Sequence, residues 1–198
     1  ILFIIARYLF SYLIKSVRFN RLLFSHFILK WIGLFVVVSL AFWNGSILFD
    51  LTWNLMENSQ VTLDITQSID FYLVRIVFFL MVTFYGIIFF HINHFCFQYF
   101  TRLAKKIWER ALSFALFGGL YLLVVPKNGW IVFSIIAALW VFLYITRLTF
   151  QLSNVRYLTF YYYLLISVAV ATISSSAIYK QFEREELISK RRFATNLL

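Results

Sequence analysis

The chain has 198 residues, of which 63% are hydrophobic and 13% charged, whereas soluble domains are about 45 to 50% apolar and roughly 25% charged. This composition and the mean hydropathy of +0.85 exclude a soluble globular domain and indicate a polytopic membrane protein. The net charge of +10 does not indicate a nucleic-acid partner, because most Lys and Arg residues lie in short segments beside apolar stretches, where they set membrane topology.

Apolar stretches recur along the whole chain. A spanning helix needs about 20 residues, and five stretches reach or approach that length, so we expect an all-α bundle with spans at 22–49, 71–91, 111–126, 130–147 and 157–178. Residues 1–14 are too short to cross alone, so 1–21 is expected to be an interfacial helix, or the end of another span, with a basic flank. Residues 179–198 are expected to be a charged helical connector to a further domain.

The positions of the charged residues predict an orientation. Lys and Arg residues gather in 15–21, in 92–110 and around 148–156, but none lies between Trp31 and Val74. The positive-inside rule therefore places these three segments in the cytoplasm and the acidic loop 50–70 outside. Five crossings then place the C-terminal tail outside, although it is rich in Lys and Arg. Either a large domain that follows the tail is translocated regardless of charge, which we favour, or 111–126 and 130–147 do not form a full hairpin.

Small residues recur at every fourth position in two of the expected spans. The spacing places them on one face of each helix, where the lack of bulk lets another helix approach closely in lipid. We predict two helix-packing faces, used within the bundle or between two copies: Ala111, Ala115 and Gly119, and Ser167, Ala171 and Ser175. A ligand groove lined by Ser174, Ser175 and Ser176 is the alternative.

Residue types that bind metals occur together at one place. His91, His94 and Cys96 could hold Zn or Cu, but no fourth ligand is near in the sequence, and on a continuous helix Cys96 points away from His91. We interpret the run as an interfacial His pair and predict no metal site. No nucleotide-binding, zinc-protease, hydrolase or kinase motif occurs, so no catalytic residue and no cofactor is predicted.

Two further groups are expected at the membrane surface. Lys30, near the inner end of its helix, is expected to extend its side chain to the headgroups. Tyr161, Tyr162 and Tyr163 are expected to anchor the last helix near the inner interface. All eight acidic residues lie in loops or near the ends of spans, which disfavours a proton-coupled transporter.

The C-terminal segment continues the last span without a break. From Tyr157 to Leu198 no Pro or Gly occurs, and good helix formers dominate after Tyr179. Glu186 lies four residues before Lys190, a spacing that stabilises a helix. We therefore expect one helix to continue straight out of the bilayer.

The sequence of this tail, YKQFEREELISKRRFATNLL, resembles the membrane exit of large multipass sensor histidine kinases of the Bacteroidetes type. In that family a Lys/Glu-rich helical run leads, through a basic residue, two residues of any kind and F-A-x-x-L, into an extracytoplasmic sensor domain. Residues 191–197, RRFATNL, are the nearest counterpart, with one residue fewer before Phe193. The resemblance implies a downstream sensor domain, another span, and cytoplasmic phosphotransfer and ATP-binding domains that work as a dimer. It covers 20 of the 198 residues.

These observations favour one function and leave an alternative. The favoured function is the sensing and signal-transmitting transmembrane module of a two-component sensor kinase in a bacterial inner membrane. The alternative is a non-catalytic structural subunit of a membrane complex, and a transporter, a channel or a membrane enzyme is less favoured. The expected partners are membrane lipids and a second copy or other membrane subunits, with no nucleic acid.

Overall fold

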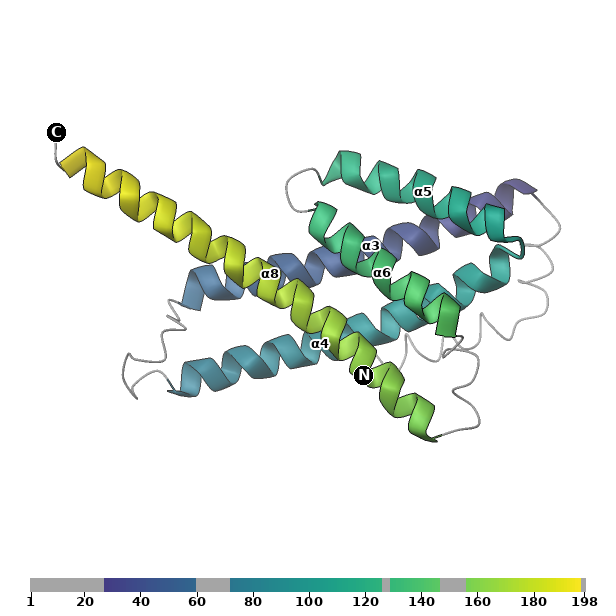
Figure 1. Cartoon of the computed structure of the whole chain (residues 1–198), viewed down its shortest axis with the longest axis horizontal. Helices are drawn as coiled ribbons and strands as arrows, with labels where there is room; N and C mark the ends of the chain where they lie inside the picture. Colours follow the sequence, from purple (N-terminus) through teal and green to yellow (C-terminus); the bar gives the residue numbers. More distant parts are fainter. Residues whose placement is uncertain (1–26, 60–71, 126–128, 147–155, 197–198) are drawn as a thin grey trace.

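The computed structural model describes residues 27–59, 72–125, 129–146 and 156–196. Every regular element in these ranges is a helix (Figure 1): α3 (Phe27–Ser59), α4 (Tyr72–Leu103), α5 (Ile107–Val124), α6 (Gly129–Thr146) and α8 (Arg156–Asn196). All five are long and apolar enough to cross a membrane. The predicted all-α bundle of five spanning helices is confirmed, and the prediction for residues 1–21 lies outside the described residues.

Successive helices run in alternating directions across the bundle (Figure 1). One end holds the short connection between α4 and α5, residues 104–106, and we call it the corner end. At the opposite end α3 ends, α4 begins and the C-terminal half of α8 projects, and we call it the tail end (Figure 1). The alternation agrees with five crossings, in which α5 and α6 form a hairpin that passes through the membrane.

Two helices are longer than the sequence analysis predicts. α3 continues past residue 49 to Ser59, and α4 continues past residue 91 to Leu103. The predicted loop therefore begins with two to three turns of helix, in which Thr52 is buried and donates its hydroxyl to the Leu48 carbonyl at 2.8 Å. The predicted 92–110 connector is wrong in extent, because most of it is helix, and Phe97, Tyr99 and Phe100 are buried in the core.

Glycines mark the places where helices approach most closely. A Cβ at Gly45 of α3 would lie 2.6 Å from Val132 of α6, and one at Gly118 of α5 would lie 2.6 Å from the Phe133 ring. On the other side of the bundle a Cβ at Gly86 of α4 would lie 3.0 Å from Val170 of α8. Because these positions have no side chain, the helices can approach closely enough for the aromatic side chains of the core to contact one another.

That core is built from stacked rings. Phe42 of α3 stacks on Tyr121 of α5 at 5.0 Å and on Phe133 of α6 at 5.4 Å, both with an interplanar angle of 17°. Offset stacking at these separations adds to the free energy of burying the rings. The aromatic pairs therefore hold α5 and α6 against α3 over the middle of the bundle.

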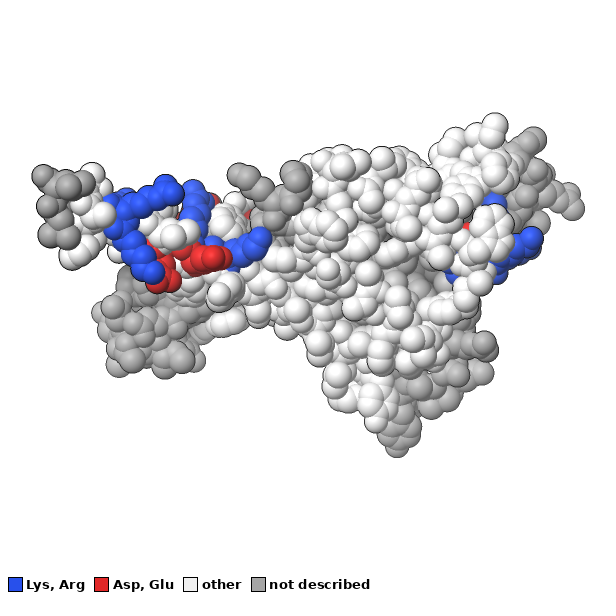
Figure 2. Space-filling model, turned by 45° about the horizontal axis from the view of Figure 1, so that its top comes forward, with Lys and Arg blue, Asp and Glu red and all other residues white. Residues whose placement is uncertain are grey.

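Charged residues gather at the two ends of the molecule. Figure 2 shows Lys and Arg in two groups separated by a wide uncharged surface, with Asp and Glu among them. Large apolar side chains such as Phe79, Leu80 and Phe84 are exposed on the middle of the helices. A belt of this kind suits the hydrocarbon core of a bilayer. The chain is a multi-pass membrane module.

Candidate functional site: the contacts of helix α8

Helix α8 joins the interior of the bundle to its exposed C-terminal end. It is 41 residues long, which corresponds to about 60 Å, twice the thickness of a hydrocarbon core of about 30 Å. It packs against α3, α6 and α4 over its first part. Every described side chain from Phe182 to Thr195 is exposed, so the last turns project from the bundle (Figure 1).

The contact of α8 with the end of α3 is made by three side chains. Arg184 of α8 donates from Nη1 to Glu57 Oε1 of α3 at 3.0 Å. The Arg184 guanidinium also lies over the Trp53 ring, 5.8 Å from its centroid, and Trp53 donates from Nε1 to Glu57 Oε2 at 3.2 Å. The Arg184 and Glu57 side chains are 50% and 42% exposed, so this contact is a weak, solvent-exposed ion pair.

Deeper in the bundle the same two helices share a polar contact. Thr52 of α3 and Ser174 of α8 are both buried, and the Thr52 hydroxyl lies 3.4 Å from Ser174 Oγ. Gln181, directly before the exposed tail, is also buried and donates from Nε2 to Glu185 at 3.2 Å. The boundary between the buried and the exposed parts of α8 therefore lies at Gln181.

A hydrogen bond between a buried tyrosine and a half-buried histidine joins α8 to α4. Tyr162 is 0% exposed, and its hydroxyl lies 2.6 Å from Nδ1 of His94. Gln98 Nε2 lies 3.0 Å from His94 Nε2, and because an amide nitrogen only donates, His94 Nε2 accepts. Neutral His94 therefore donates from Nδ1 to the Tyr162 hydroxyl. Phe90 packs beside the His94–Tyr162 pair, and its ring stacks on that of Tyr163 with the centroids 4.7 Å apart.

This arrangement corrects one prediction. Tyr162 does not anchor α8 at the membrane surface, because it belongs to the core, while its neighbours Tyr161 and Tyr163 are exposed. The interpretation of His91 and His94 as an interfacial pair stays a prediction. α4 continues past Cys96 to Leu103, Cys96 is 0% exposed, and half-buried His94 lies against Tyr162 of α8. Within the described ranges no three His, Cys, Asp or Glu side chains are grouped as a metal site would need.

The predicted helix-packing faces lie on the surface of the single chain. Ala111 and Ala115 are exposed and line a groove of about 410 Å³, and a Cβ added at Gly119 would meet nothing within 4 Å. On α8 the three predicted residues are also exposed and line a groove of about 430 Å³ beside α4: Ser167, Ala171 and Ser175. Close packing within the bundle instead uses Gly118, the direct neighbour of Gly119. A packing role for these faces, between two copies, stays a prediction.

The corner end is fixed by contacts that the sequence analysis did not predict. Lys30 of α3 forms an ion pair with Glu109 of α5 at 2.8 Å, so Lys30 has a protein partner in addition to any contact with headgroups. Glu109 also accepts from the backbone N–H of Lys106 at 3.4 Å, in the first turn of α5, where a negative charge is favourable. Arg110 donates to the carbonyls of Ala104 at 2.7 Å and Thr101 at 3.3 Å, which satisfies the end of α4.

One feature of the sequence indicates the helix N-terminus at this corner. An acidic residue three positions after a break in the apolar pattern is typical of a helix N-terminus, and Glu109 follows Lys105 and Lys106 in that way. Its pairing with Lys30, 79 residues earlier, requires the tertiary structure.

No known protein family matches the chain, and neither a curated protein nor a solved structure is significantly similar to it. The contacts of α8 therefore carry the functional argument. They join one continuous helix to the bundle at its tail end through Glu57 and at its opposite half through His94. Such an arrangement can transmit a displacement along α8 in either direction.

Proposed function

We propose that this multi-pass module is the sensing and signal-transmitting transmembrane part of a two-component sensor kinase in a bacterial inner membrane. The observation that carries the proposal is the continuity of α8, which runs from buried Tyr162 to exposed Thr195 without a break. A stiff helix that connects a packed core to an exposed extension is suited to transmit a shift or rotation between them. The resemblance of the tail to the membrane exit of sensor histidine kinases supports this class.

The contacts of α8 suit a change between states of similar energy. The Arg184–Glu57 pair is half-exposed, and such pairs contribute about 0 to 1 kcal/mol. The part-buried His94–Tyr162 hydrogen bond is less exposed to solvent, and among the described residues it is one side-chain hydrogen bond between α8 and α4. A stimulus that moves the exposed end of α8 would break the first contact at little cost and shift the population at the second.

The proposed partner of the module is a second copy of the chain. The exposed face with Ser167, Ala171 and Ser175 offers small side chains to a helix that approaches in lipid. If two copies pack there, Cys at position 171 forms a disulfide-linked dimer under mild oxidation in native membranes, whereas Cys at position 172, which is exposed but turned by about 100° around α8, does not. Equal crosslinking at both positions would argue against this face.

The test of the proposed function uses the product of the complete reading frame in native membranes. Incubation with radiolabelled ATP should label it on a histidine, and the label should be lost in acid and retained in base. Substitution of Tyr162 by Phe should change the extent of labelling while the protein level stays constant. A complete product that takes up no phosphate from ATP, alone or with added membrane extract, would contradict the kinase assignment.

A structural subunit of a membrane complex is the second candidate. The two exposed small-residue grooves beside α4 and α5 favour it, since each offers a surface to a helix of another subunit. The two candidates differ in purification: a subunit copurifies in a fixed ratio with unrelated membrane proteins, whereas a sensor module purifies as copies of its own chain.

A further inference from the structure

A pocket lies between α3 and the exposed half of α8, outside the contacts described for transmission. Its volume is about 390 Å³, and Trp53, Leu187 and Ile188 form its apolar wall. Three cationic side chains and one acidic side chain, Glu183, also line it, and the cationic residues are Lys180, Arg184 and Arg191. The pocket therefore joins an apolar surface to a concentration of positive charge.

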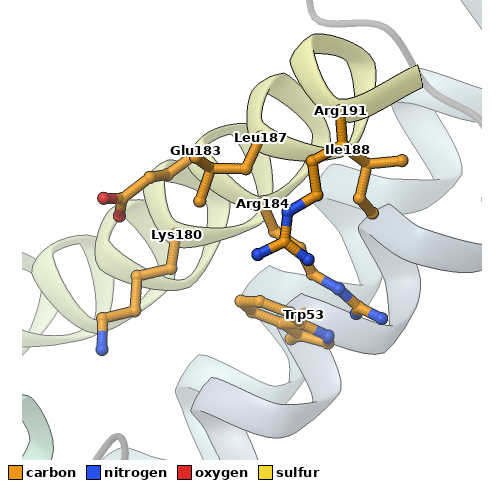
Figure 3. Close-up of a pocket in the computed structure, with 7 residues that line it drawn as sticks. All are labelled: Trp53, Lys180, Glu183, Arg184, Leu187, Ile188 and Arg191. Atoms are coloured by element: carbon orange, nitrogen blue, oxygen red, sulfur yellow. The ribbon is translucent and has the colours of Figure 1, made fainter. Parts of the chain in front are cut away.

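The two arginines converge on the same side of the pocket. Figure 3 shows the side chains of Arg184 and Arg191 reaching from α8 toward Trp53, while Glu183 points away from it. Positions 184 and 191 are two turns apart and so lie on one face of the helix. Glu57 is already bonded to Arg184 and Trp53, and no described carboxylate forms an ion pair with Arg191.

The spacing of the ion pairs on α3 matches the thickness of a bilayer. On α3 the two ion-paired residues Lys30 and Glu57 are separated by about 40 Å at 1.5 Å per residue. A bilayer with its headgroups measures about 40 to 45 Å, so the spacing suits a placement of the pocket, beside Glu57, among the lipid headgroups. Trp53 lies one turn before Glu57, at the level where indole rings are favoured.

We propose that this pocket binds the phosphate group of an anionic phospholipid from the leaflet at the tail end. A guanidinium presents paired N–H donors that match phosphate oxygens, and two guanidinium groups on one helix face can hold one phosphate. Leu187, Ile188 and Trp53 would contact the glycerol backbone and the first methylene groups of the acyl chains. The assignment needs only the membrane module and does not depend on the two-component proposal.

The test compares two neighbouring arginines in the chain reconstituted in nanodiscs with equal amounts of phosphatidylglycerol and phosphatidylcholine. Arg191→Gln removes a pocket residue, and Arg192→Gln removes the same charge from an exposed residue outside the pocket. Native mass spectrometry should show one retained phosphatidylglycerol on the unsubstituted chain and on Arg192→Gln. Arg191→Gln should retain it about tenfold more weakly, the loss expected for one charge-assisted contact.

Three outcomes would overturn the proposal. Equal retention by Arg191→Gln and the unsubstituted chain would show that Arg191 does not hold the lipid, and equal losses in both variants would show that only general charge attracts it. Displacement of the bound lipid by millimolar inorganic phosphate would assign the pocket to the free anion. Protection of Cys96 from a maleimide serves as the folding control, since Cys96 is buried, and Arg191→Lys gives a second variant that keeps the charge without the paired donors.

Discussion

Arg184 of α8 and Glu57 of α3 are 127 residues apart in the chain and form an ion pair of 3.0 Å. Because Glu57 lies at the end of the span of α3, this contact places the exposed half of α8 at the end of the bundle where α3 ends and α4 begins. The corner with Lys105 and Lys106 lies at the opposite end (Figure 1). The basic tail thus departs at the end that the positive-inside rule assigns to the outside.

The two ion pairs are expected to differ in their contribution to stability. Glu109→Gln leaves Lys30 without its partner where both side chains are less than 20% exposed, and should lower the free energy of unfolding by about 1 to 3 kcal/mol. Glu57→Gln at the half-exposed pair should lower it by less than about 1 kcal/mol. SDS-induced unfolding in mixed micelles measures both. Equal effects would contradict the difference in burial.

Adjacent glycines in α5 should respond in opposite ways to the same substitution. A Cβ at position 118 would lie 2.6 Å from the Phe133 ring, which is itself stacked on Phe42, so Gly118→Ala should destabilise the bundle by about 1 to 3 kcal/mol. Gly119→Ala meets nothing within 4 Å and should stabilise the helix by about 0.5 to 1 kcal/mol. The same unfolding titration would refute the packing of α5 on α6 if Gly118→Ala were neutral.

Two neighbouring tyrosines in α8 should also differ in their response to the same substitution. Tyr162→Phe keeps the ring and removes the hydroxyl that accepts from His94, so we expect a loss of about 0.6 to 1.7 kcal/mol, the range for polar contacts between helices in membranes. Tyr163 is 51% exposed, and its hydroxyl has no bond to any residue in the described part of the chain, so Tyr163→Phe should be neutral. A neutral Tyr162→Phe would mean that the bond to His94 adds nothing to stability.

The sequence predicted the helices well because their signal is local. Length and apolar composition decide whether a helix spans a membrane, and all five spans follow from them. The ends of α3 and α4 were placed wrongly because polar residues such as Thr52 and His94 suggested an interface. Their partners, Leu48 and Tyr162, satisfy them inside the bundle.

The contacts between helices could be predicted only in part. The spacing of small residues by four predicted that Gly119 lies on a helix-packing face, but within the bundle it is Gly118 that packs closely against a neighbouring helix. Which face of a helix meets its neighbour depends on how both helices are rotated about their axes. The pairing of Lys30 with Glu109 and of Arg184 with Glu57 joins residues far apart in the sequence, and no local pattern relates them.

The most direct test of the account is the sidedness of two residues at opposite ends of the bundle. In intact cells, with Cys96 replaced by Ser, a membrane-impermeant maleimide should label Cys at position 189 of the exposed α8 tail. Cys at position 105, in the corner between α4 and α5, should be labelled only after the membrane is permeabilised. Labelling of both positions from the same side would contradict the five-span arrangement.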